Sequence, residues 1–224
     1  MLSTKDLALL GQKGISEKQI EEQLDCFRKG FPFLEIMASA SVEKGISVID
    51  KEAQVGYMEA WDAYLNQNKR ILKFVPASGA ASRMFKDLYE FLDSDSNEPF
   101  SPFMEKFFAG LTSFAFYNAL DAVCLKNEKR TIPQLLSDKE YKAVVNNLLS
   151  SSGLNYGQLP KGLLQFHTYP ASVRTAMEEH LAEGAMYAKN NAAEVNIHFT
   201  VSPEHKALFE HLVAAKVPAY ENKF

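Results

Sequence analysis

The sequence predicts an α/β fold with a partial parallel sheet, and two segments carry this prediction. The first is the apolar run from Ile71 to Val75, typical of a buried parallel strand, which leads through small residues to a helix starting at Met84. The second runs from Val195 to Val201, where apolar and polar residues alternate as in a strand. Because helical segments separate the two strands, we expect a right-handed parallel crossover between them.

Residues 1–68 are predicted to be a helical N-terminal region. Ser16 and Gln19 have the spacing of a capping box, and Gly30 with Pro32 ends the helix that follows. A second helical pattern covers residues 51–67. The α/β domain then occupies residues 69–224.

A large helical insertion is expected at about residues 94–156, between the two strands. Beyond it, the pattern predicts a helix from Ala171 to Ala188 and another from Pro203 to Ala215. The segment from Val217 to Tyr220 resembles the start of a further strand. We therefore expect this chain to be the N-terminal part of a longer protein.

Composition limits the classes of function. The chain has 224 residues, 46% hydrophobic and 23% charged, which is ordinary for a globular protein. A net charge of −4 provides no basic field for nucleic acid, and no apolar run is long enough to span a membrane. Cys26 and Cys124 lack the spacing of a zinc site, and no secretory signal is recognisable. A cytoplasmic protein with reduced thiols is expected.

The turn after the first strand is the main candidate site. Small side chains let a ligand approach the backbone, and N–H groups at a helix start attract anions. An arginine adds a planar, permanently charged fork that suits phosphate oxygens. The sequence therefore predicts phosphate binding by Ser78, Gly79, Ala80, Ala81, Ser82 and Arg83.

These residues resemble the signature loop of nucleotidyltransferases that make nucleotide sugars. In that family Gly-x-Gly-x-Arg follows the first strand and a Pro-Lys pair comes later. Here Gly79, Ala81 and Arg83 fall on the two glycines and the arginine, and Pro160-Lys161 falls on the pair. The surrounding sequence resembles still more closely a bacterial family of unknown function with this fold. The resemblance implies a nucleotidyltransferase-like, Rossmann-like sheet of the GT-A type.

The resemblance also implies a reaction between a nucleoside triphosphate and a sugar phosphate, giving a nucleotide sugar and pyrophosphate. Arg83 and Lys161 would be its catalytic residues, with Arg83 on the β- and γ-phosphates and Lys161 on the α-phosphate or the sugar phosphate. Magnesium is expected in the full-length protein, but no metal ligand is recognisable in these residues. The base, the sugar and the oligomeric state are not predicted.

Two alternatives remain open: a nucleotide-binding or regulatory module without turnover, and a helical interaction protein without a ligand. His167 is interpreted either as a substrate contact or as a hydrogen-bonded structural histidine. Glu178, Glu179 and Glu183 are expected to form a solvated helix face.

Overall fold

The computed structural model describes residues 2–221 and contains two compact units that divide between Gly56 and Tyr57. Helices accompany small sheets, one of them a parallel strand pair between helical segments, so the fold is α/β as predicted. Within residues 2–221, no helix is both long and apolar enough to cross a membrane.

The first unit consists of short helices and a minimal strand pair. The predicted capping box is present: the N–H of Gln19 donates to Ser16 Oγ, and the N–H of Ser16 donates to Gln19 Oε1. Gly30 ends the helix with a φ of 78°, a conformation that favours glycine. The elements are α1 (Thr4–Gln12), α2 (Glu17–Lys29), β1 (Ser41–Val42), β2 (Gly45–Ile46) and α3 (Lys51–Leu65), which continues into the second unit.

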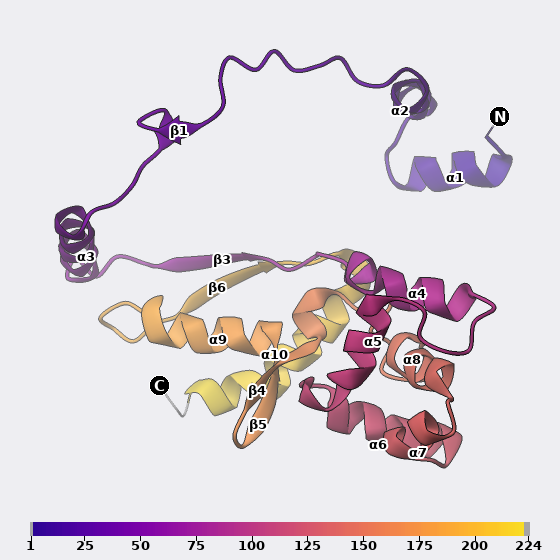
Figure 1. Cartoon of the computed structure of the whole chain (residues 1–224). Coiled ribbons are helices and arrows are strands. Elements are labelled where there is room, and N and C mark those ends of the chain that lie inside the picture. Colours follow the sequence, from indigo (N-terminus) through magenta and orange to yellow (C-terminus); the bar gives the residue numbers. More distant parts are fainter. Residues whose placement is uncertain (1, 222–224) are drawn as a thin grey trace. The chain divides into compact units, whose positions relative to one another are not determined.

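The sheet of the second unit pairs the two predicted strands. β3 (Leu72–Pro76) lies parallel to β6 (Asn196–Thr200), with Phe74 opposite His198. Helices α9 (Ala176–Tyr187) and α10 (Lys206–Glu221) lie on the same side of this pair (Figure 1). A Cβ added at Gly184 of α9 would lie 2.7 Å from Ile197 Cδ1, so glycine lets α9 approach β6 closely.

The chain between β3 and β6 is helical for most of its length and has its own apolar core. Phe91, Leu120, Leu135 and Leu148 are fully buried in it. This burial provides the main stabilisation of the segment. The elements are η1 (Ser82–Phe85), α4 (Lys86–Asp93), α5 (Pro102–Ala109), η2 (Leu111–Ser113), α6 (Tyr117–Glu128), α7 (Ile132–Ser137) and α8 (Tyr141–Leu149).

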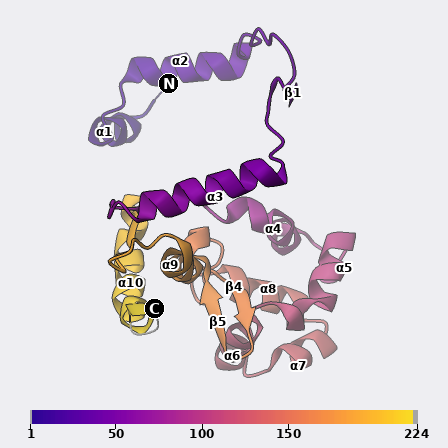
Figure 2. The ribbon, with the colours of Figure 1, turned by 90° about the vertical axis from the view of Figure 1, so that its left-hand side faces the viewer.

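A β-hairpin replaces the first part of the helix predicted from Ala171, and that prediction was wrong there. After the short turn η3 (Lys161–Leu163), β4 (Gln165–Tyr169) pairs antiparallel with β5 (Ser172–Thr175), as Figure 2 shows. Pro170 lies in the turn, where its missing N–H does no harm. The helix begins only after Thr175, whose side chain caps it with Glu178.

The strand predicted at Val217 is also absent, because α10 continues through Pro218 to Glu221. Val217 directly precedes this proline. Because the helix continues, Val217 lies one turn after Val213, and both side chains line an apolar cleft. Packing of the helix side chains therefore overrides the local preference of the Val-Pro segment for an extended chain.

Candidate functional site

The two predicted phosphate-binding segments lie side by side. The N–H of Lys161 donates to the carbonyl of Gly79 over 3.0 Å, and Ala80 forms an isolated antiparallel bridge with Pro160. The helical segment that separates them in sequence thus returns the Pro-Lys pair to the turn after β3.

The turn carries several N–H groups without an acceptor. Among residues 2–221, none accepts a hydrogen bond from the N–H of Ser78, Gly79, Ala80, Ser82 or Arg83. All five residues are exposed. The turn therefore offers donors to the solvent or to a ligand.

Ala81 differs from the rest of the turn because it is buried. Its φ of −88° and ψ of −5° are right-handed, so alanine stands without backbone strain at the position that the nucleotidyltransferase pattern gives to its second glycine. Its carbonyl accepts from the N–H of Met84 over 2.8 Å, which starts η1. Ala81 thus anchors the turn to the core.

Two glycines of the site have different surroundings. Gly79 does not have a positive φ, and a Cβ added there would meet nothing within 4 Å. A Cβ at Gly162 would lie 3.0 Å from two ring atoms of Phe209. Gly162 therefore serves packing, whereas no contact of the described fold requires glycine at position 79.

The two predicted catalytic cations are exposed. Neither Arg83 nor Lys161 has a side-chain hydrogen bond or ion pair within the described part of the chain. The hydroxyls of Ser78 and Ser82 likewise have no hydrogen-bond partner there. Both cations are thus available to an anion.

His167 lies half-buried on β4, opposite Arg174 of β5. No described contact brings it to the turn after β3, and its ring has no hydrogen bond within residues 2–221. Its role as a substrate contact stays a prediction.

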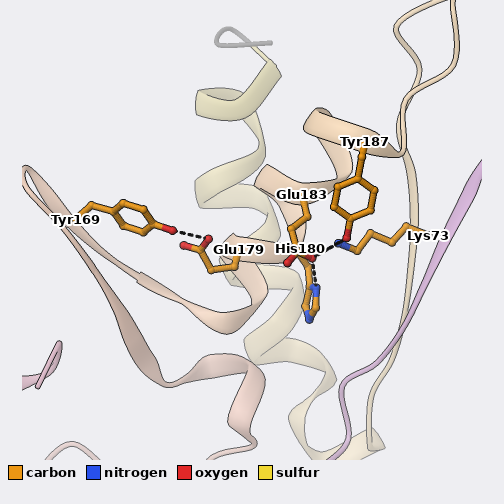
Figure 3. A network of polar contacts seen from close by, with 6 residues as sticks. All are labelled: Lys73, Tyr169, Glu179, His180, Glu183 and Tyr187. Carbon is orange, nitrogen blue, oxygen red and sulfur yellow. Dashed lines mark hydrogen bonds and ion pairs between the residues drawn. The ribbon is translucent and has the colours of Figure 1, made fainter. Parts of the chain in front are cut away.

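A polar network that the sequence analysis missed joins β3 to α9 (Figure 3). Lys73 forms an ion pair with Glu183 and donates to the hydroxyl of Tyr187 over 2.8 Å. Tyr187 donates to Glu183 Oε2 over 3.1 Å, and His180 Nδ1 lies 3.1 Å from the same oxygen. The hydrogen bond from Lys73, opposed by partial desolvation, lowers the pKa of Glu183 to about 2.

The other two glutamates of α9 are also engaged, so the predicted solvated helix face was wrong. Glu179 accepts from the hydroxyl of Tyr169 over 2.7 Å (Figure 3). Glu178 is only 5% exposed, accepts from the N–H of Thr175 over 2.9 Å and pairs with Lys216 at 2.9 Å. Glu179 and Glu183 are four residues apart and share a helix face, but Glu178 precedes Glu179 directly and lies about 100° away around the helix, which was a signal against one common face.

An apolar cleft of about 610 Å³ lies along α9, β6 and α10. Its walls include Leu181, Ile197, Phe199 and Val213, and none of the predicted site residues lines it. The cleft is therefore separate from the turn that is predicted to bind phosphate.

No three His, Cys, Asp or Glu side chains within residues 2–221 gather as a metal-ligand set.

Comparison with curated proteins finds no match, and comparison with solved structures finds none either. Residues 3–224 match the profile of a family described as a domain of unknown function, DUF4301. The match covers nearly the whole sequence, and the chain therefore belongs to the DUF4301 family.

Proposed function

We propose that the turn from Ser78 to Arg83, together with Lys161, binds the phosphates of a nucleoside triphosphate in a nucleotidyltransferase reaction. The observation that carries the proposal is the surplus of donors. Several N–H groups and two exposed cations without ion-pair partners border one turn, and no acceptor among residues 2–221 engages them. A bound phosphate would supply the acceptors.

Gly79 supports the same proposal. Because neither its φ nor its surroundings require glycine, the open space beside its backbone is available for a ligand to approach. The hydrogen bond from Lys161 to Gly79 holds the second cation's backbone next to that space. The arrangement suits a ligand with several phosphate groups.

In the proposed reaction, an oxygen of a sugar phosphate attacks the α-phosphorus of the triphosphate. A new P–O bond forms as the bond between the α-phosphorus and its bridging oxygen breaks, and pyrophosphate leaves with that electron pair. Arg83 would neutralise charge on the leaving β- and γ-phosphates, and Lys161 charge on the α-phosphate or the attacking group. Magnesium, when bound, would supply further neutralisation of the phosphates.

Binding is tested by isothermal titration of the chain with ATP, GTP, CTP and UTP in the presence of magnesium. Arg83→Ala is expected to weaken binding about tenfold or more, because one charge-assisted contact is lost. The matched control is Lys86→Ala, which removes an exposed cation paired with Glu90 on the following helix. Equal losses in the two variants, or no affinity for any triphosphate, would contradict the proposal.

Turnover is tested by release of pyrophosphate in the longest natural form of the protein. Lys161→Ala is expected to reduce the rate by about a hundredfold, the scale for losing one preorganised charge-stabilising group. Binding without turnover in every form would favour the regulatory module instead.

A further inference from the structure

The exposed face of the β3 and β6 pair carries two aromatic rings beside the proposed phosphate site. Phe74 and His198 are directly opposite in the parallel register. Their ring centroids are 5.1 Å apart and their planes differ by only 9°, so the rings are stacked. Phe74 is nevertheless 59% exposed, which leaves much of its ring uncovered.

This face runs without interruption into the turn after β3. Along the chain, Phe74, Pro76 and Ser78 are exposed, whereas Val75 and Ala77 between them are buried. The alternation places the exposed residues on one face. From Phe74 to Ser78 the chain advances by four residues, the last two of them beyond the end of β3 at Pro76, which is roughly 13 Å at the rise of an extended chain.

We propose that the stacked Phe74 and His198 rings bind the base of the nucleoside triphosphate whose phosphates occupy the Ser78–Arg83 turn. This inference rests on the proposed function and adds the base subsite to it. A nucleobase continues an aromatic stack because every base has a flat π face. The span from Phe74 to the turn is of the length that joins a base to its terminal phosphates.

The charges of the site favour a single nucleotide over a nucleic acid strand. The chain carries a net charge of −4, so a polyanion would meet general repulsion. The cations placed by the structure, Arg83 and Lys161, border the turn at the end of β3. The aromatic pair would recognise a base by stacking alone, so its affinities for the four bases should differ only modestly.

The experiment compares ATP with inorganic tripolyphosphate, which has the phosphates but no base. By titration calorimetry with magnesium, ATP is expected to bind the chain about tenfold more tightly than tripolyphosphate, the scale of one stacked base. Phe74→Leu keeps an apolar side chain but removes the ring, and is expected to abolish this difference while leaving tripolyphosphate affinity unchanged. Arg83→Ala should weaken both ligands.

Leu72→Ala is the matched control, because Leu72 is 55% exposed on the same face of β3 but has no ring. It should retain the preference for ATP. Equal affinities for ATP and tripolyphosphate in the unaltered chain would overturn the base subsite while leaving phosphate binding standing. A preference for ATP that survives Phe74→Leu would place the base elsewhere and also overturn it. Binding of neither ligand would overturn the proposed function and, with it, this inference.

Discussion

The N–H of Lys161 donates to the carbonyl of Gly79 over 3.0 Å, which fixes a residue beyond the helical segment against the turn that precedes it. The backbone positions of the two predicted phosphate-binding segments are therefore coupled. A change that moves one segment therefore moves the other. Substitutions at Gly79 and Gly162 distinguish an effect on ligand contact from an effect on the packing that holds the segments in place.

Gly79→Ala is expected to leave folding intact and to weaken triphosphate binding. The new methyl group meets nothing within 4 Å, and the backbone does not have a positive φ. The free energy of unfolding in urea should thus be unchanged or rise by up to about 1 kcal/mol, through lower entropy of the unfolded chain. The methyl group would occupy the ligand's approach, so affinity by calorimetry should fall. Unchanged affinity would mean that no ligand approaches this backbone.

Gly162→Ala, in contrast, is expected to lower the free energy of unfolding. Its Cβ would lie 3.0 Å from the buried ring of Phe209, so either the ring or the η3 turn must move. Overpacking of this kind costs about 1 to 3 kcal/mol. The measurement is the free energy of unfolding in urea for both glycine variants. If Gly162→Ala is as stable as Gly79→Ala, the ring of Phe209 can move aside without a measurable cost.

The Lys73 and Glu183 pair should make stability depend on pH in the acid range. The pKa of Glu183 falls from 4.5 to about 2 in the folded chain, chiefly through the hydrogen bond from Lys73. A lowered folded pKa stabilises the fold above about pH 4.5, and this contribution is lost as the pH falls towards 2. Because Glu183 is 41% exposed, solvent screening keeps the effect small.

Two variants test this pair. In Lys73→Met, the carboxyl pKa of Glu183, followed by NMR titration, should return towards its ordinary range. In Glu183→Gln, the part of the acid dependence due to this carboxyl should be missing from the unfolding curves. A Glu183 pKa that stays near its low value without Lys73 would assign the shift to His180 and Tyr187 instead.

The two thiols should differ in reactivity. Burial, assisted by the charges of Asp121 and Glu128, raises the pKa of Cys124 to about 11, whereas Cys26 is half-buried. The raised pKa means that the folded chain favours the neutral thiol. This contribution to stability is present below pH 9.0, the ordinary pKa, and is lost as the pH rises through about 11. At about pH 8, a thiol reagent should modify Cys26 quickly and Cys124 only on unfolding. In Cys26→Ser, rapid labelling of the folded chain would contradict this assignment.

The sequence predicted the positions of both strands of the parallel pair, because apolar residues dominate the segment before Ser78 and alternate with polar ones around His198. The burial expected for the first strand was wrong. Leu72 is 55% and Phe74 59% exposed, and within β3 only Val75 is buried, so one face of this strand is open. The helix after Ser16 appears because its capping box is local chemistry between Ser16 and Gln19. Such signals need no knowledge of distant contacts.

The failures occur where contacts between separate secondary-structure elements decide the conformation of the chain. In the β4 and β5 hairpin, Tyr169 and Arg174 contact Glu179 of the following helix, and these contacts fix a turn around Pro170 that no local period marks. The extended course expected at Val217 yields to packing of α10. The ion pair between Lys73 of β3 and Glu183 of α9 could not be predicted from the sequence of either element alone, because the two residues are 110 positions apart.

The bridge between Ala80 and Pro160 has a consequence for how such a chain can change in evolution. Paired antiparallel residues lie about 5 Å apart at their Cα atoms, so the intervening segment leaves and re-enters the sheet domain at nearly one point. Among residues 2–221, Leu164 is the only buried residue of its core that comes from outside that segment. A short link could join the two ends, and relatives are free to enlarge, shrink or replace the segment without altering the path of the strands.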